Sequence, residues 1–487
     1  MNKVTFLAVL LIVLEAFHPV PPVQAEAASF GQGKNLEVPN VQPFPDKRYH
    51  LERLSLSRVL EKTGNFSPEI LVGRKKLKIS YADRIQAIET FIPSLTVSFG
   101  TMTYSGEVQN SRGIFYNIQK QQANMNHGVL LLDQPGISAF QTIVRTTRIE
   151  QTRSQLSETI NRKSTQAARL YFENLASLSR VAVLQEAVRI SKRILNQEKK
   201  LMELGGASIV GVLRAAHEVA RDSRHLVEEE RKTYRVAFRL SQIMGIDANT
   251  MPVPEESFIL PRLYIRLPDD PDRLIELSDE KRPLLREFEK NRLARSQELT
   301  GTLYAPLVPI VGANILNGAL GPDFNGLSGY NQTLFFALWT IGPGGLFDPA
   351  AIHLAQTREQ HAEALLARTR IRVHRQVRDA YEEVRKSLEE EKIAVSDMRL
   401  AKLTFLASQR RVQLGVYHAL ELIISLRDLV DAQLHYIDAT RGLEESQFNL
   451  LFSVGTRPRI TQVPLSVGPT VDPGIFRFDI PSGGHPE

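Results

Sequence analysis

The chain has 487 residues, of which 43% are hydrophobic and 23% charged, and it carries a net charge of +6 at pH 7. The charge is small for this length, and basic and acidic residues are interleaved, so the composition argues against nucleic-acid binding. The sequence has no cysteine, which excludes disulfides, thiolate metal sites and an acylated N-terminal cysteine.

The first residues have the pattern of a secretory signal peptide. Lys3 precedes an apolar run over 4–14, and Val23-Gln24-Ala25 is a small-x-small cleavage site, with Ala25-Glu26-Ala27 as a second choice. We therefore expect residues 1–25 to be removed on export, leaving an N-terminal extension over 26–53. No later apolar run reaches the length of about 18 residues that a transmembrane helix needs, so only β-strands in a closed barrel could span a membrane.

After the extension the sequence repeats itself. Residues 54–245 and 278–456 each run from a helical stretch through two short alternating segments into a long helix. A proline-rich linker over 246–277 joins them, and an irregular tail follows over 457–487. Constant spacing of landmark residues is the evidence for duplication. The pairs are Tyr171 and Tyr381, Gly205 and Gly415, and Gly245 and Gly455, all 415 − 205 = 210 apart, then Pro93 and Pro306 at 213 and Pro68 and Pro283 at 215.

The alternating segments predict two β-strands in each repeat, at 94–104 and 123–133 and at 305–316 and 331–341. Their length of about 11 residues fits a tilted membrane-spanning strand. The first segment also indicates which face meets lipid. We expect Leu95, Val97 and Phe99 to face lipid, and Ser94, Thr96 and Ser98 to face a polar lumen.

Two uninterrupted helical patterns follow the strands, over 137–203 and 350–413. At 1.5 Å per residue each would be about 100 Å long, so each needs neighbours along its whole length. The returning helix over 420–451 carries two adjacent apolar stripes, which predicts packing on two sides. The first stripe is Leu422, Leu429, Tyr436, Leu443 and Leu450, and the second is Ile423, Val430 and Ile437.

A glycine ends each long helix. Gly205 and Gly415 can adopt the left-handed conformation that stops a helix, and a second helix restarts almost at once. Ser208 is the expected N-cap of the restarted helix in the first repeat, whereas His418 occupies that position in the second and caps less well. The result is two antiparallel helical hairpins whose tips point away from the strands.

These elements predict a mainly α-helical, internally duplicated fold with some β-structure. Four strands per chain cannot close a barrel, but three chains would supply twelve. The hairpins of the three chains would then continue the transmembrane β-barrel as an α-helical barrel.

The motifs, in this order and repeated twice, resemble the TolC family of outer-membrane efflux and secretion channels over residues 50–456. The helix start and strand entry of that family are seen as LSLSRVLEK, FSPEI and FIPSL, with serine where the family has asparagine. The strand-to-helix crossings are seen as LLLDQPGISA and GPGGLFDPAA. The tip motif, glycine-x-x-serine-x-x-aspartate, is seen as Gly205, Ser208 and Gly211, with glycine in place of aspartate.

The resemblance implies a homotrimer in outer-membrane lipid, exported but not lipidated, with a long periplasmic extension. It would dock a periplasmic adaptor protein and serve an inner-membrane pump of the RND, ABC or MFS type. Family gating implies a ring of acids, which Glu421 would keep, whereas Ile424 stands where the best-known members carry a second aspartate. Residues at the tips would contact the adaptor: Gly205, Gly206, Ser208, Gly211, Gly415, Tyr417 and His418.

The residues also allow other interpretations. Glu421 could equally be a solvated acid, and Ile424 could pack rather than narrow a pore. The sequence shows no nucleophile with its base, no phosphate loop and no metal-ligand spacing, so we predict neither an enzyme nor a cofactor. An exported coiled-coil scaffold or adhesin without a pore is the alternative function, although it has no need of four strands at matching positions.

Overall fold

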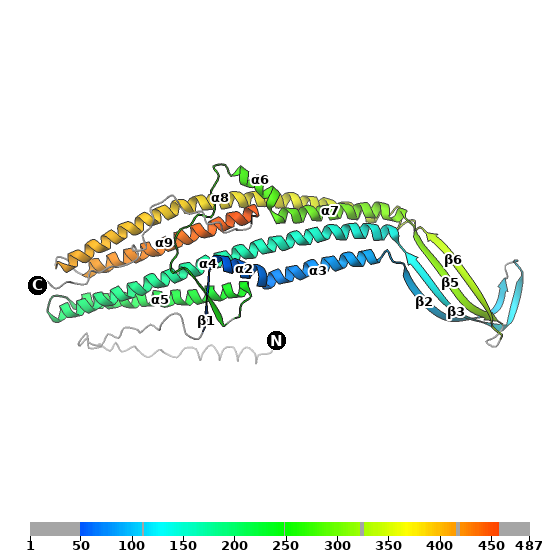
Figure 1. Ribbon diagram of the computed structural model, residues 1–487, viewed down its shortest axis with the longest axis horizontal. Coiled ribbons are helices and arrows are strands. Elements are labelled where there is room, and N and C mark those ends of the chain that lie inside the picture. Colours follow the sequence, from blue (N-terminus) through cyan, green and yellow to red (C-terminus); the bar gives the residue numbers. More distant parts are fainter. Residues whose placement is uncertain (1–48, 110–111, 248, 322–325, 415–418, 457–487) are drawn as a thin grey trace, which may run out of the picture.

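The computed structural model describes residues 49–109, 112–247, 249–321, 326–414 and 419–456. The predicted signal peptide, the predicted tail and the tip residues Gly415, Tyr417 and His418 lie outside these ranges. The described chain is elongated, with a four-stranded sheet at one end and two helical hairpins that extend from it (Figure 1).

The same order of elements occurs twice. The first repeat holds α2 (Leu56–Phe66), α3 (Pro68–Glu89), β2 (Ser94–Gln109), β3 (Phe115–Asp133), α4 (Pro135–Glu203) and α5 (Ile209–Met244). The second holds α6 (Asp272–Lys281), α7 (Pro283–Tyr304), the short 3₁₀ helix η1 (Ala305–Leu307), β5 (Ile310–Gly321), β6 (Ser328–Leu338), α8 (Pro349–Gln413) and α9 (Ala419–Val454). Helices α3 and α7 each have 22 residues, and α5 and α9 each have 36.

The strands form one antiparallel sheet in the order β2-β3-β5-β6, so the four predicted strands are confirmed. Their predicted bounds were partly wrong. Strands β2 and β3 extend well beyond 94–104 and 123–133, and β6 spans 328–338 rather than 331–341. Strand β5 begins only after Pro309, because the preceding residues form η1 with Pro306 at its start. The structural counterpart of Pro93, which directly precedes β2, is therefore Pro309 at 309 − 93 = 216 and not Pro306.

The two long helices confirm the predicted hairpins. Helix α4 has 69 residues and packs against α5, and α8 has 65 and packs against α9. Both predicted stripes of α9 are buried, with Tyr436 and Ile437 fully enclosed. No helix in the described ranges is long and apolar enough to cross a membrane.

In each repeat, the helix that ends the hairpin meets, end to end, the helix that leads into the strands. Gly245 ends α5 in the left-handed conformation with φ 69°, and a Cβ there would lie 2.5 Å from the carbonyl oxygen of Phe66, which ends α2, and 3.4 Å from Pro68, which begins α3. Gly455 ends α9 with φ 84°, and its Cβ would lie 2.6 Å from the Cα of Arg282, directly before α7. Helix α5 thus abuts α3, and α9 abuts α7, so that each pair flanks a long helix (Figure 1).

The linker is more ordered than its prolines suggest. Strand β4 (Thr250–Pro254) pairs in parallel with β1 (His50–Leu54), and the remainder crosses from the first hairpin to the second (Figure 1). The repeated tyrosines hold it in place. Tyr171 donates a hydrogen bond to Glu256, and Tyr381 donates one to the carbonyl oxygen of Pro268 at 3.0 Å.

Candidate functional site: the hairpin tips and the contacts that hold them

The tip of the first hairpin has the predicted turn. Gly205 has φ 77°, its N–H donates to the Met202 carbonyl at 3.0 Å, and the Gly206 N–H donates to the Leu201 carbonyl at 2.8 Å. This is the Schellman pattern that satisfies the last carbonyls of a helix. The predicted cap is confirmed, since the Ser208 side chain accepts a hydrogen bond from the Gly211 N–H at 3.3 Å.

An acid that the sequence analysis missed lies beside Gly211. A Cβ at this position would be 2.7 Å from the Glu198 carboxylate, which α4 supplies and which is only 7% exposed. Gly211 therefore leaves room for a carboxylate from the opposite helix. The available signal was that Glu198 follows Ile194 and Leu195 at helical spacing, on an apolar side of the long helix and close to its end.

The second tip places Glu421 in an ion pair. Its carboxylate lies 3.1 Å from the Arg411 guanidinium, which α8 supplies across the turn. Ile424 follows on the same side of α9 and is 47% exposed. Asp428 and Asp431 continue this exposed stripe away from the tip.

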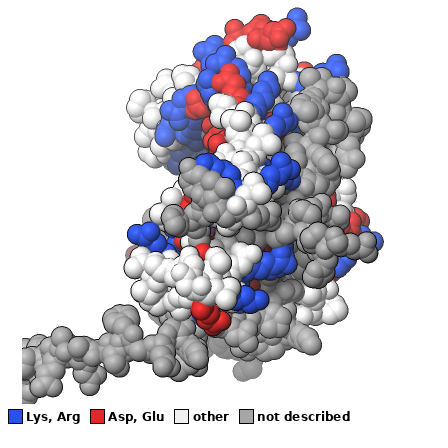
Figure 2. Space-filling model, turned by 90° about the vertical axis from the view of Figure 1, so that its left-hand side faces the viewer, with Lys and Arg blue, Asp and Glu red and all other residues white. Residues whose placement is uncertain are grey.

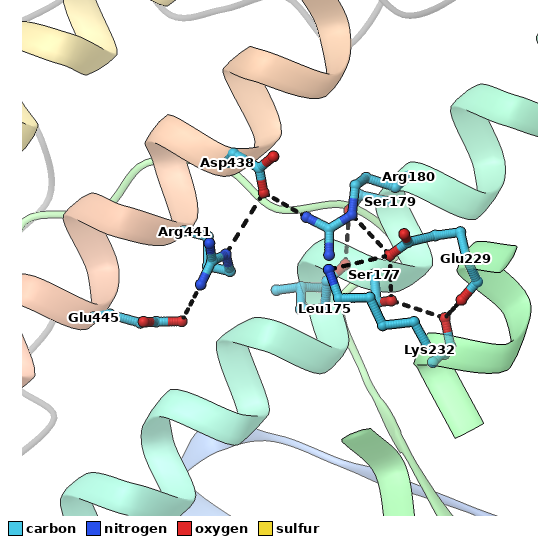
Figure 3. Close-up of polar contacts among 10 residues, drawn as sticks. Leu175, Ser177, Ser179, Arg180, Glu229, Lys232, Asp438, Arg441 and Glu445 are labelled. Carbon is cyan, nitrogen blue, oxygen red and sulfur yellow. Dashed lines mark hydrogen bonds and ion pairs between the residues drawn. The ribbon is translucent and has the colours of Figure 1, made fainter. Parts of the chain in front are cut away.

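A buried arginine joins the two hairpins farther from the tips (Figure 3). The Arg180 guanidinium of α4 lies 2.8 Å from the Glu229 carboxylate of α5 and 2.6 Å from the Asp438 carboxylate of α9. Ser177 also donates to Glu229, at 2.6 Å. The pair with Glu229 is shielded from water, because the two side chains are only 6% and 14% exposed, whereas Asp438 is 49% exposed.

A second link lies nearer the tips. Arg427 of α9 lies 2.8 Å from the buried Glu218 of α5, and Arg221 pairs with the same carboxylate at 2.6 Å. Burial and the charge of Glu218 raise the pKa of the neighbouring Asp222. The α8–α9 hairpin is thus tied to the α4–α5 hairpin by charge pairs at two levels.

The linker is bound to α9 by a buried carboxylate. Glu444 is 1% exposed and accepts a hydrogen bond from the Arg262 N–H at 2.8 Å. Gln447 accepts from the Tyr264 N–H at 2.7 Å and donates to the Arg262 carbonyl at 2.8 Å. Burial raises the pKa of Glu444 to about 8, although the Arg262 backbone and charge act in the opposite direction.

The strand register groups the apolar residues of the sheet. Leu95 is paired through Leu131 and Ala313 to Phe335, so these four side chains share a face. Val97 and Phe99 lie on this face too, because side chains alternate along β2. By the same alternation Leu334, Phe336 and Leu338 of β6 lie on the opposite face, with Ser94, Thr96 and Ser98.

In the described ranges, no group of three or more His, Cys, Asp or Glu side chains could hold a metal ion.

No protein-family model and no curated protein matches the sequence. Solved structures do match. The outer membrane channel CmeC of Campylobacter jejuni has a TM-score of 0.69 at 12% identity, over 82% of this chain and 85% of that chain. The outer membrane protein VceC of Vibrio cholerae has a TM-score of 0.67 at 14% identity, over 83% and 97%. The open MtrE outer membrane channel of Neisseria gonorrhoeae has a TM-score of 0.62 at 14% identity, over 83% and 89%.

The chain has the fold of these outer-membrane channels. The TolC-like fold predicted from the motifs is therefore confirmed, with its long helical hairpins and its β part. Of the structures named above, CmeC and MtrE are outer membrane channels. In this fold the tips lie at the end of the helices remote from the sheet (Figure 1).

Proposed function

We propose that the chain is the outer-membrane exit duct of a tripartite efflux or type I secretion system. Three copies would form a channel that passes substrates driven by an inner-membrane pump, with a periplasmic adaptor at the tips. The chain itself would supply no energy and no chemistry, only a polar path and a gate.

The observation that carries this proposal is a pair of unpartnered edges. Helices lie in the order α3, α4, α7, α8 near the sheet, and the strands lie in the order β2, β3, β5, β6. Within the described chain β2 and β6 each pair on one side only, as do α3 and α8. The edges also expose apolar side chains, including Val72 and Ile79 of α3 and Ile371 and Ile393 of α8, all at least 60% exposed.

Such edges are costly for a monomer. Unpaired strand edges are not tolerated in lipid, and exposed apolar residues at helical spacing seek a partner. The α3–β2 edge of one copy can meet the β6–α8 edge of the next. Three copies would then close a ring, with twelve strands at one end and twelve helical columns beyond.

Exposed apolar residues at the helix–strand junctions support a membrane boundary there. Ile92 between α3 and β2 is 70% exposed, and Ile341 and Phe347 between β6 and α8 are 76% and 80% exposed. Trp339, which is 49% exposed, donates a hydrogen bond to the Leu307 carbonyl at 3.2 Å. Indole rings with one polar contact suit the interface between lipid tails and water.

The gate would lie at the tips. If the exposed stripe of α9 faces the lumen, three copies of Glu421 and Ile424 would line its narrowest point. Each Glu421 carboxylate is balanced by Arg411 of its own chain, which reduces the repulsion expected from three bare acids. The links from Arg180 and Arg427 to the opposite hairpin would hold α9 in place, so an adaptor could bias the gate by competing for these charges.

Cysteine cross-linking tests the closure of the ring, because the natural chain has no cysteine. Val72 and Ile371 lie at a similar level, since Lys76 of α3 bonds Gln155, Gln155 bonds Glu287 of α7, and Arg370 of α8 pairs with Glu289. They occupy opposite edges of one chain. A disulfide between Val72→Cys and Ile371→Cys must therefore join two chains, and complete oxidation should give covalent trimers.

The matched control pairs Val72→Cys with Leu354→Cys, another exposed residue of α8. Leu354 lies 371 − 354 = 17 residues from Ile371, which is about 25 Å along a helix. This pair should not cross-link. A detergent-purified protein that stays monomeric and forms no cross-links with either pair would refute the channel and favour the scaffold.

A further inference from the structure

We propose that a cavity between the helices at the base of the sheet binds an organic anion with an apolar body, a carboxylate or sulfonate, on its way through the duct. The transport role rests on the proposed function, whereas the binding itself requires only the fold of one chain. The inference goes further by naming a chemical class of solute and the residues that would hold it.

The cavity lies where the helices meet the strands (Figure 1) and has a volume of about 490 Å³. Helices α4 and α7, the turn over 344–348 and the first part of α8 border it. This volume suits a small organic molecule. Helices α4 and α7 are the inner pair in the order α3, α4, α7, α8, so a neighbouring copy at either edge would leave the cavity open.

Apolar side chains line one part of the cavity. Ile137, Phe140 and Val144 of α4 form one side, and Pro306 of η1 lies at its end. Phe140 packs closely on α7, because a Cβ added at Gly301 would be 3.0 Å from the Phe140 Cβ. Ile137 is 43% exposed, so an apolar ligand would cover surface that the chain leaves in contact with water.

Three arginines border the same cavity, and one of them has no acidic partner. Arg148 pairs with Glu298, and Arg145 lies 3.8 Å from Asp83. Arg358 of α8 is exposed, and no carboxylate of the described residues lies within ion-pair distance of its guanidinium. A carboxylate or sulfonate in the cavity could therefore form a charge-assisted hydrogen bond with Arg358.

The two acids of the cavity are already bonded. Glu298 pairs with Arg295 at 2.7 Å in addition to Arg148. Asp348 accepts hydrogen bonds from the Gly344 N–H at 2.8 Å and from the Ala351 N–H at 2.9 Å. An incoming anion thus meets three cations and two carboxylates whose charge is largely compensated, which favours it over a cation.

The turn that borders the cavity is preformed. Phe347 has φ 61°, and among the described residues it is the only one with positive φ that is not a glycine. The turn is fixed by hydrogen bonds from the Gly342 N–H to the Leu346 carbonyl and from the Leu346 N–H to the Thr340 carbonyl, both at 2.8 Å. Strained residues of this kind cluster at ligand sites. A wall that is fixed in advance lowers the entropy cost of binding.

The cavity opens on the face of the chain that carries the exposed stripe of α9. Arg148 and Gln166 of α4 are 166 − 148 = 18 residues apart, which is about five helical turns, so they lie on one face. Gln166 lines a second cavity together with Glu445 of α9. Glu445 continues the stripe, since it follows Asp431 and Asp438 at intervals of seven residues. If this stripe faces the lumen, a solute in the duct can reach the cavity.

Exposed charge alone would not provide this site. At the ends of the hairpins, Lys and Arg side chains lie near Asp and Glu side chains on the surface (Figure 2). Water and salt screen charges in that setting. In the cavity, a cation and apolar side chains border one space, so a ligand that combines both characters makes both kinds of contact. An inorganic anion would make only the ionic contact.

The single tryptophan of the sequence reports on the cavity. Trp339 bonds the Leu307 carbonyl, next to Pro306 in the cavity wall. Energy transfer from Trp339 to 8-anilinonaphthalene-1-sulfonate is measured on the natural chain in phosphatidylcholine nanodiscs. The transfer should saturate, and adamantane-1-carboxylate should compete about tenfold better than inorganic sulfate or 1-adamantylammonium. Transfer that does not saturate, or equal competition by all three, overturns the proposal.

Charge variants locate the site. Arg358→Gln should weaken dye binding about threefold and Arg358→Glu about tenfold, and in Arg358→Glu the better competitor should be 1-adamantylammonium. Ile137→Ser should weaken the dye about threefold without changing the preference for an anion. The matched control is Arg368→Glu, which reverses another exposed arginine of α8 outside the cavity. Equal losses in Arg358→Glu and Arg368→Glu would show that net charge, and not the cavity, is responsible.

Two further measurements separate the alternatives. If soluble dihexanoyl phosphatidylglycerol competes about tenfold better than adamantane-1-carboxylate, the ligand is a lipid and the proposal fails. Channel conductance is recorded on the same preparation. A protein that conducts but shows no saturable, Arg358-dependent transfer refutes this inference alone. A protein that binds the dye but forms no trimer and no channel refutes the proposed function and the transport role of the cavity.

Discussion

The two repeats have the same order of helices and strands and differ in the segments that pack around their long helices. The lengths of α3 and α7, and of α5 and α9, are the same, and both repeats use a left-handed glycine where two helices meet end to end. Their long helices differ in burial. Helix α4 lies between the α3–α5 pair and the α7–α9 pair, whereas α8 has a neighbour on one side only within the described chain.

Equivalent positions of the two repeats can therefore carry side chains of very different character. Glu444 of α9 is buried against the linker, and its counterpart at 444 − 210 = 234 is Tyr234, whose ring stacks on Phe238. Arg180 of α4 joins three helices, and its counterpart at 180 + 210 = 390 is the exposed Glu390. The comparison shows that local sequence signals determine the order of the helices and where they end, whereas the surroundings of each repeat determine its polar contacts.

The largest expected effect concerns the two joints where helices meet end to end. Gly245→Ala and Gly455→Ala should each lower the free energy of unfolding by about 3 kcal/mol, because a side chain adds strain at positive φ and meets backbone atoms of the abutting helix. Gly205→Ala should cost only about 1 kcal/mol, since nothing lies within 4 Å of its Cβ. Urea unfolding in detergent measures all three. Equal losses would mean that the two helix joints are not tight.

Breaking the ion pairs of Arg180 should cause a similar loss of stability, whereas the equivalent change in the second repeat should not. Arg180→Met removes the short ion pair of the poorly exposed Glu229, which keeps only the Ser177 hydroxyl and Lys232 at 3.9 Å, and should cost about 3 kcal/mol. Glu390→Met, at the equivalent position, should change stability by less than about 0.5 kcal/mol. Arg189→Met is a second control, because its pair with Glu186 is exposed. If Arg180→Met and Arg189→Met cost the same, the contacts of Arg180 do not hold the hairpins together.

The sheet offers a test of which face meets lipid. An arginine on the lipid face near the bilayer midplane costs about 2–4 kcal/mol. Val97→Arg should therefore impair trimer assembly far more than Thr96→Arg, as judged by heat-resistant trimers on gels. Leu334→Arg adds to the comparison, because Leu334 lies on the face of Thr96. A stronger effect of Leu334→Arg than of Val97→Arg would reverse the assignment of the two faces.

The buried Glu444 of the second repeat predicts a pH dependence of stability. The pKa of Glu444 is about 8 when folded and near its ordinary value of 4.5 when unfolded, so the folded chain binds more protons between these values. Stability should then fall by up to about 1.4 kcal/mol per pH unit as the pH rises through this window. Glu256, Arg262 and Tyr264 face the same carboxyl and contribute to its titration.

Glu444→Gln should reduce this slope, because glutamine keeps an acceptor for the Arg262 N–H but does not titrate. Tyr234→Phe should leave the slope unchanged. Urea unfolding at pH 5, 6.5 and 8 provides the data. A slope that survives unchanged in Glu444→Gln would assign the titration to another group.

The smallest expected effects concern the gate. Glu421→Gln should weaken cation block from the periplasmic side, and Arg411→Ala should strengthen it by releasing the carboxylate from its partner. Ile424→Ala should raise single-channel conductance if it forms a constriction. Planar bilayer recordings give these values, each within a few-fold of the natural chain. Conductance and block that are unchanged in all three variants would show that the gate lies elsewhere.

The helices were predictable because their signals are local. Heptad stripes identified the buried faces of α9, and Gly205 with Ser208 specified the tip turn within five residues. Four strands were predictable as well, but their ends were not. Alternation fades in the outer parts of β2 and β3, and Pro306 gave the same helix-stop signal as Pro309, which directly precedes β5.

The contacts between distant segments were not predictable. Strands β1 and β4 pair across 250 − 50 = 200 residues, and both are only five residues long, with prolines in β4. The partners of Arg180 lie in α5 and α9, and Glu198 reaches Gly211 only because the hairpin brings them together. In a single sequence, charged residues on a helix suggest only a face that is exposed to solvent. Only the folded structure shows which of them form ion pairs with distant segments of the chain.

The end-to-end helix joints have a consequence for synthesis and folding. Gly245 abuts the start of α3 across 245 − 68 = 177 residues, and Gly455 abuts the start of α7 across 455 − 283 = 172. Contacts this distant in sequence close slowly, because the intervening chain must first lose its freedom. Helix α3 leaves the ribosome early, yet it must wait for the hairpin to turn and return before its end is covered. We therefore expect each repeat to dock late and as a unit, with α3 and α7 the last helices to gain protection from hydrogen exchange.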